Sequence, residues 1–382
     1  MTHWIHQAWR GATGFLHHTR RLAWVDLLVL AGVAGAVCGL VSLAGEWTGA
    51  LRPTVAIDLS PWALPLYTFF SLMRGLAAYV LSLAFTLGYG YWAAKDRMAE
   101  RVLMPLLDIL QSIPVLGFMP GLVLALVAVF PSSNFGLELA AVVMIFTGQA
   151  WNMTFSFYHS LRSLPLELQE PAQVYRFTGW QRLKWVELPY ATMGLVWNSM
   201  MSMAGGWFFL MINESFRLGE RDFRLPGIGS YMSVAVEHGD TQAMCWAIVA
   251  MTLMIVALDQ LLWRPVVVWA QKFRLEEAGS TEVASSWFLN WLGRSRILAL
   301  GKLKLRRWRR RRAAAASGPP ARRSSRGASG PQRRLSWAAF LLLLTALAAG
   351  GMKLLHLLVG VSLVDWLTVA AASLGTLGRV LL

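Results

Sequence analysis

Charge is scarce in this chain of 382 residues: 14% of the residues are Asp, Glu, Lys or Arg, while 56% are hydrophobic. Soluble domains carry about 25% charged residues, which keep their surfaces in water. Together with the mean hydropathy of +0.49, the shortage of charge excludes an ordinary soluble globular protein. The sequence therefore predicts a protein whose surface is solvated largely by lipid.

Cysteine is also scarce, and the motifs of enzymes are missing. Cys38 and Cys245 both lie in apolar runs, which excludes a disulfide framework and a cysteine-based metal site. The seven histidines show no paired ligand spacing, and no nucleophile–base arrangement stands out. No Gly-x-x-x-x-Gly-Lys-Ser/Thr phosphate loop occurs either. We therefore expect neither an enzyme nor an ATPase, with no metal site and no cofactor in this chain.

The net charge of +15 comes from one segment. Between Trp287 and Ser336 there are fifteen Lys or Arg and no acid, and the rest of the chain is balanced. No nucleic-acid motif accompanies this charge, so we expect no nucleic-acid partner. A basic connector between apolar runs is typical of a cytoplasmic loop that touches anionic membrane lipid.

Six apolar runs of membrane length follow one another along the chain. They cover roughly 27–44, 69–94, 103–130, 137–158, 191–212 and 243–270. Pro105, Pro114 and Pro120 interrupt the third run, which predicts a short interfacial helix that crosses the membrane only after about Pro114. The fold class is thus an all-α polytopic membrane protein with a six-span bundle and one or two extra C-terminal helices.

The distribution of basic residues predicts the orientation and four regions. Lys and Arg collect in the loops after the second, fourth and sixth runs, which places those loops and the N-terminus in the cytoplasm. We expect a basic N-terminal segment at 1–23 and a six-span domain at 24–274. A connector at 275–335 would begin with a surface-lying amphipathic helix near Trp287 and continue as a disordered stretch at 313–332. A seventh span, at about 337–360, would lie in a last region at 336–382.

The loop at 161–190 carries the one specific motif. It reads Glu170-Pro171-Ala172-Gln173-Val174-Tyr175-Arg176, followed after nine residues by Val186-Glu187-Leu188-Pro189. This spacing resembles the EAA loop of binding-protein-dependent ABC transporter permeases of the type I importer fold. That pattern is Glu-Ala-Ala, three residues, Gly, nine residues and Ile-x-Leu-Pro.

The resemblance implies a permease subunit in the bacterial inner membrane, with ABC ATPase subunits, a solute-binding protein and a second permease unit as partners. The partner ATPase would hydrolyse ATP. The residues 161–190, called the coupling loop below, would dock into that ATPase. The coupling residues are Glu170, Pro171, Ala172, Tyr175, Arg176, Phe177, Gly179, Trp180, Leu188 and Pro189. The side chains of Tyr175, Phe177 and Trp180 are the expected anchors.

Two positions depart from the family pattern. Pro171 replaces the first Ala, which predicts that Glu170 begins a helix, since proline is tolerated there. Arg176 occupies the usual glycine position and disfavours a left-handed hinge. We therefore expect the helix to continue to about Phe177, with the turn at Thr178-Gly179.

Polar or small residues recur at helical spacing in two runs. They are Gln149, Asn152 and Ser156 in the fourth run, and Asn198, Ser202 and Gly205 in the fifth. These two faces predict a translocation path, and the same pattern fits interhelical hydrogen bonding and small-residue packing equally well. Glu214, at the outer end of the fifth run, is expected to be an exposed loop acid in preference to a residue that meets solute.

Short stretches such as Gly148-Gln149-Ala150-Trp151-Asn152 and Leu225-Pro226-Gly227-Ile228-Gly229 are similar to the nitrate, taurine and sulfonate branch of the family. That resemblance implies a small oxyanion as solute. Ser373-Leu374-Gly375 echoes Ser71-Leu72-Met73, which suggests a tandem-fused permease with an incomplete second unit in 363–382. Two alternatives stay open: a membrane scaffold or assembly protein, and a secondary transporter.

Overall fold

In the computed structural model, the described residues are 24–52, 54–218, 221–273, 286–295 and 362–381, with isolated positions between 304 and 360. The chain forms two compact units, Met1–Ala316 and Ser317–Leu382, and each is described by itself. The predictions for 1–23, for the stretch 313–332 and for most of 337–360 lie outside the described residues.

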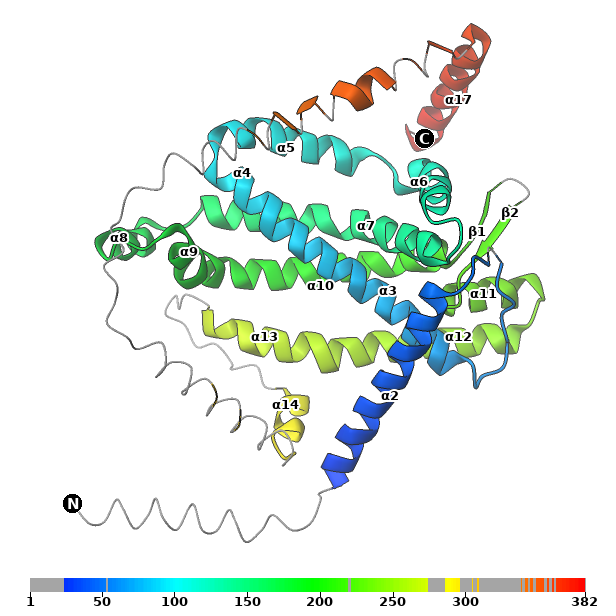
Figure 1. Ribbon diagram of the computed structural model, residues 1–382, viewed down its shortest axis with the longest axis horizontal. Helices are drawn as coiled ribbons and strands as arrows, with labels where there is room; N and C mark the ends of the chain where they lie inside the picture. Colours follow the sequence, from blue (N-terminus) through cyan, green and yellow to red (C-terminus); the bar gives the residue numbers. More distant parts are fainter. Residues whose placement is uncertain are drawn as a thin grey trace. The chain divides into compact units, whose positions relative to one another are not determined.

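The first unit is a bundle of long helices with one short hairpin (Figure 1). The first half runs α2 (Trp24–Thr48), α3 (Leu64–Phe85), η1 (Thr86–Gly90), α4 (Tyr91–Lys95), α5 (Arg97–Ser112), α6 (Val115–Val129) and α7 (Phe135–Arg162). Then come α8 (Leu166–Val174), α9 (Gly179–Arg182), η2 (Leu183–Glu187), α10 (Leu188–Glu214), β1 (Ser215–Leu218) and β2 (Arg221–Arg224). The unit continues with α11 (Ile228–Glu237), α12 (Thr241–Leu258), η3 (Asp259–Trp263), α13 (Arg264–Ala270), η4 (Gln271–Phe273) and α14 (Trp287–Leu292).

The long helices coincide with the predicted apolar runs. Four continuous helical stretches in the described part of the chain are long and apolar enough to cross a membrane: Trp24–Thr48, Leu64–Lys95, Gly179–Glu214 and Thr241–Phe273. The bent pair α5 and α6 is a fifth stretch if it counts as one broken span. With 28 residues, α7 is about 42 Å long at 1.5 Å per residue, and so also long enough to cross. The all-α polytopic membrane fold predicted from the sequence is therefore confirmed.

A sharp bend at Pro114 divides the third run, as the prolines predict. The axes of α5 and α6 meet at 95°, and Ile113, before the proline, is extended with φ −77° and ψ 119°. Proline disfavours the helical conformation in the residue before it, which ends α5 there. The buried side chains of α5 are Ala99, Leu103 and Leu107, spaced four residues apart. They form one buried apolar face of the helix.

The centre of the bundle is α7, which contacts α3, α6 and α10. Figure 1 shows α7 and α10 side by side, with α8 and α9 at one end of the pair and the hairpin with α11 at the other. We call these the coupling-loop end and the hairpin end. The hairpin is antiparallel, with Ser215 paired to Arg224 and Leu218 to Arg221.

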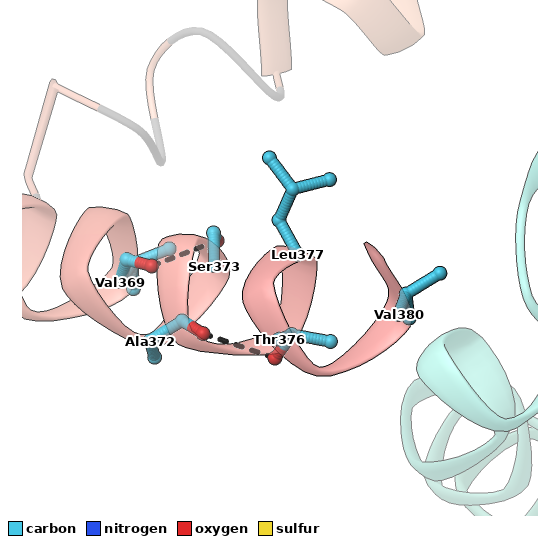
Figure 2. Close-up of a pocket in the computed structure, with 6 residues that line it drawn as sticks. All are labelled: Val369, Ala372, Ser373, Thr376, Leu377 and Val380. Atoms are coloured by element: carbon cyan, nitrogen blue, oxygen red, sulfur yellow. Dashed lines mark hydrogen bonds between the residues drawn. The ribbon is translucent and has the colours of Figure 1, made fainter. Parts of the chain in front are cut away.

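In the second unit the structure describes the helix α17 (Leu363–Leu381). Its hydroxyl groups are satisfied within the helix: Ser373 donates to the carbonyl of Val369 at 2.8 Å and Thr376 to that of Ala372 at 2.9 Å (Figure 2). Such back-bonding lets an apolar helix carry Ser and Thr without exposing their donors to lipid. A second permease unit in this region stays a prediction.

Candidate functional site

The coupling loop folds as a helix, a turn and a second short helix. The helix α8 begins at Leu166 behind Pro165, and Glu167 is the acid in its first turn. Glu170 is the fifth residue of α8, and Pro171 lies inside the helix, so the prediction that Glu170 begins it is wrong. The earlier proline explains the difference, because its fixed φ sets the helix start before Glu170 is reached.

Arg176 adopts the left-handed conformation, with φ +50°, at the position where the family pattern has glycine. The amide of Phe177 donates to the carbonyl of Ala172 at 2.9 Å, and the amide of Arg176 donates to that of Gln173 at 3.0 Å. These two bonds are a Schellman motif, which ends α8 at Val174. The prediction that the helix continues to Phe177 is therefore wrong. The bonds of the helix end outweigh the cost of a left-handed arginine.

The second helix, α9, begins at Gly179 through a capping box. The hydroxyl of Thr178 accepts from the amide of Gln181, and the side chain of Gln181 accepts from the amide of Thr178. Gly179 adjoins open space. Because the box fixes the start of α9 directly after the left-handed turn, the two helices are held in one defined arrangement.

Two of the predicted anchors are exposed. Tyr175 is 75% and Trp180 is 71% exposed. Phe177 is half-buried and stacks on Tyr175 with ring centroids 6.3 Å apart. Of the other coupling residues, Glu170 and Pro171 are exposed, Ala172 is buried, and Leu188 and Pro189 are half-buried at the start of α10. The loop thus presents aromatic side chains beyond the end of the bundle, on a base of hydrogen-bonded turns.

The six residues predicted for a translocation path do not share one surface. Gln149 is buried between three helices: it accepts from Ser82 of α3 at 3.5 Å and donates to the sulfur of Met203 on α10 at 3.4 Å. Asn198 donates to Ser156 at 2.8 Å. Ser202 is buried, while Asn152 and Gly205 are exposed. Gln149 and the Ser156–Asn198 pair therefore bridge helices, which is the packing alternative, and Asn152 with Gly205 remain on accessible faces.

The hairpin end holds a buried ion cluster that could not be recognised from the sequence, where only Glu214 of its members was considered. Arg74 of α3 donates from Nε and Nη2 to both carboxylate oxygens of Glu138 on α7, at 2.5 and 2.7 Å. Its Nη1 donates to Glu214 at the end of α10, at 2.7 Å. All three side chains are at most 1% exposed. Glu214 is thus a buried member of an ion cluster, and the expectation of an exposed loop acid is wrong.

The cluster also fixes the loop that leads to α11. The second oxygen of the Glu214 carboxylate accepts from the amide of Gly229 at 2.7 Å, and Ser71 donates to the first at 2.6 Å. Ser71 in turn accepts from the amide of Ile228 at 2.9 Å. Arg74 in an apolar run was the available signal, because ionisable residues in spans pair inside the bundle. With its guanidinium engaged by two carboxylates, Arg74 ties three helices together.

Comparison with known proteins gives a family and a relative. Residues 86–262 match the family described as "Binding-protein-dependent transport system inner membrane component". The chain is 23% identical over 240 residues to the glycine betaine transport system permease protein OpuAB of Bacillus subtilis (strain 168), covering 63% of this chain and 79% of that protein.

Two crystal forms of inward-facing MetNI methionine ABC transporter are similar to part of the chain. They are 16% and 17% identical, with TM-scores of 0.47 and 0.44, and each match covers 55% of this chain and 96% of the other. The segment matched by the family contains the coupling loop and the helices α7 and α10. Together with the apolar membrane helices, the family match and the relative support an ABC importer permease, which is a transport component and not an enzyme.

Proposed function

We propose that this chain is the transmembrane permease subunit of an ABC importer and that its coupling loop docks into the ATPase. The observation that carries the proposal is the exposed pair Tyr175 and Trp180 on a hydrogen-bonded helix–turn–helix that lies within the family match. Interfaces gain most of their affinity from a few buried aromatic anchors surrounded by a polar rim. Arg176, which is exposed beside them, supplies rim charge.

The proposed assembly follows from the division of labour in such importers. The partner subunits hydrolyse ATP, a solute-binding protein delivers the solute, and a second permease unit completes the path. The six-span domain at 24–274 would lie in a bacterial inner membrane with the N-terminus and the coupling loop in the cytoplasm, and the connector at 275–335 would touch lipid. Lys and Arg collect in the coupling loop and in the loops after the second and sixth runs, which supports this orientation.

The solute is proposed as a small oxyanion of the nitrate, sulfonate or taurine kind. Glycine betaine is the second candidate, because the relative in Bacillus subtilis is described as a glycine betaine permease. Taurine and glycine betaine are both small zwitterions, so neutral polar groups such as Asn152 on the accessible faces suit either. Uptake of labelled nitrate, taurine and glycine betaine into cells that express the whole transporter would separate the candidates.

The docking is tested by substituting the exposed aromatics. Truncating a buried interface anchor costs at least about 2 kcal/mol, or roughly thirtyfold in affinity. We expect Tyr175→Ala with Trp180→Ala to abolish co-purification of the ABC ATPase and ATP-dependent uptake, while membrane insertion stays normal. Trp62→Ala is the matched control, since Trp62 is 91% exposed but lies just before α3, whose first residue, Leu64, packs in one cluster with Tyr231 of α11 at the hairpin end.

Two outcomes would favour the alternatives. Uptake that survives the double substitution and needs no ATPase would point to a secondary transporter. A chain that binds neither ATPase nor solute in any variant would point to a scaffold or assembly protein.

A further inference from the structure

A buried carboxylate lies at the base of the coupling loop. Glu187 is fully buried, and its Oε1 accepts from Nζ of Lys95 at 2.5 Å. Nε of Arg182 lies 2.7 Å from the same oxygen, as an ion pair. One carboxylate oxygen thus holds two cations, which themselves are about one-third exposed.

The groups in this cluster come from separate parts of the chain. Lys95 is the last residue of α4, at the end of the second span, and Glu187 is the last residue of η2, directly before α10. Arg182 ends α9 and also donates to the side chain of Gln169 on α8 at 3.1 Å. Gln169 in turn donates to the carbonyl of Leu164, just after α7, at 2.8 Å.

The local backbone favours a rigid connection here. The segment η2 (Leu183–Glu187) is a π-helix that joins α9 to α10 without a break in the helical stretch Gly179–Glu214. Such π-bulges insert one extra residue per turn and recur at functional sites. Because α9 and α10 are continuous, any displacement of α9 reaches α10 directly, and it reaches α4 through Lys95.

We propose that Glu187 is the positioning residue that couples movement of the coupling loop to the second and fifth spans. Its carboxylate joins the end of α4, the start of α10 and, through Arg182 and Gln169, the helix α8. Two connections would transmit the movement: the continuous helical stretch joins α9 to α10, and the ion pair of Glu187 with Lys95 joins the start of α10 to α4. Without the ion pair, the coupling loop would move α10 but would leave α4 behind.

This inference rests on the proposed permease function but is tested separately from it. The readouts are ATPase co-purification, ATP hydrolysis and solute uptake by the whole transporter, with nitrate, taurine and glycine betaine as probes. We expect Glu187→Gln and Lys95→Met each to lower uptake about tenfold, since residues along a coupling network change coupling by this order. Co-purification and ATP hydrolysis should stay within about twofold of the unsubstituted complex, a range that corresponds to less than about half a kcal/mol.

Three further variants distinguish coupling from simple stability. Lys95→Arg keeps the charge and should retain uptake, because Lys95 is partly exposed and has room for the larger head group. The double variant Glu187→Gln with Lys95→Met should lose no more uptake than either single variant, since both remove the same link. Lys272→Met is the matched control, as Lys272 is an exposed cation in η4 and should leave uptake unchanged.

The outcomes test the positioning role of Glu187 and the proposed permease function separately. Normal uptake by Glu187→Gln would overturn the positioning role and leave the permease function standing. Loss of ATPase binding along with uptake would also overturn it, because Glu187 would then only hold the docking surface together. Absence of ATPase from the unsubstituted complex would contradict the proposed function itself.

Discussion

Arg74 of α3 and Glu138 of α7 form a bidentate ion pair that is buried: the side chain of Arg74 is 0% and that of Glu138 is 1% exposed. Both contacts, 2.5 and 2.7 Å long, match the fork geometry that distinguishes arginine from lysine. The pair lies in a chain of 14% charged residues, where a buried ion without its partner would be costly.

Removing one member of this pair should therefore destabilise the bundle severely. We expect Glu138→Gln or Arg74→Met to cost about 3–5 kcal/mol, measured as a lower thermal unfolding midpoint of the detergent-solubilised protein. Arg74→Lys should also lower the unfolding midpoint, because a single ammonium cannot bond both carboxylates in the geometry of the guanidinium.

The exposed pair Arg52 and Glu46 provides the control. These side chains are 55% and 26% exposed and 3.4 Å apart, so Arg52→Met should change stability by less than about 1 kcal/mol. Equal effects at the two sites would mean that burial does not decide the contribution of Arg74.

The left-handed Arg176 leads to a stabilising substitution. A non-glycine residue in this conformation costs about 1–2 kcal/mol. Glycine removes this cost, but its greater conformational entropy in the unfolded chain offsets part of the gain in stability. We expect Arg176→Gly to raise the stability of the coupling loop by about 0.5–1 kcal/mol, measured as slower proteolysis between α8 and α9.

Arg176→Ala separates the strain from the charge. It removes the exposed guanidinium but keeps the Cβ that makes φ +50° unfavourable, so proteolysis should proceed as in the unsubstituted chain. If alanine protects as well as glycine, the effect belongs to the side chain and backbone strain is not its cause.

The spans could be predicted from the sequence because each apolar run is long enough to fix its own structure. The bend at Pro114 follows equally from local chemistry, since proline restricts the residue before it. The partners of Arg74 could not be predicted in this way. Glu138 and Glu214 are 64 and 140 residues away, and only the packing of α3, α7 and α10 brings them together.

The coupling loop shows the same limit on a smaller scale. Its motif lies between α7 and α10, but residue preferences at Pro171 and Arg176 predicted the wrong helix ends. At Pro171 the earlier Pro165 sets the start of the helix, and at Arg176 the bonds of the helix end outweigh a left-handed cost of about 1–2 kcal/mol. Glu187 gave no signal of its role, because an acid beside a basic loop is usually a solvated charge.

Adjacent glycines in α10 offer a matched test of helix packing. A Cβ on Gly206 would lie 2.5 Å from Nε2 of the buried Gln149, whereas a Cβ on Gly205 would meet nothing within 4 Å. We expect Gly206→Ala to cost about 1–3 kcal/mol through overpacking, measured by thermal unfolding.

Gly205→Ala should instead stabilise α10 by up to about 1 kcal/mol, since alanine is the better helix former. A Gly206→Ala protein as stable as its Gly205→Ala counterpart would mean that Gln149 moves away without loss. The close approach of α7 and α10 would then be less constrained than the contacts indicate.

The basic connector should bind anionic lipid, and the structure shows which contacts hold its α14 segment. Ser295 donates to the buried carboxylate of Asp26 at 2.8 Å, and the rings of Trp24 and Trp291 lie 6.3 Å apart. These contacts hold the segment of α14 against the beginning of the first span, where indole rings prefer the headgroup level.

Each basic residue near an anionic surface contributes about 1 kcal/mol, and this attraction fades within a Debye length. A peptide of residues 287–312 should therefore bind vesicles that contain anionic lipid, and its binding should fall steeply as salt rises. The matched control is the same peptide with its Lys and Arg changed to Gln, which keeps the aromatic side chains. Equal binding of both peptides, or equal binding to neutral vesicles, would assign the affinity to the aromatic face and remove the electrostatic role of the connector.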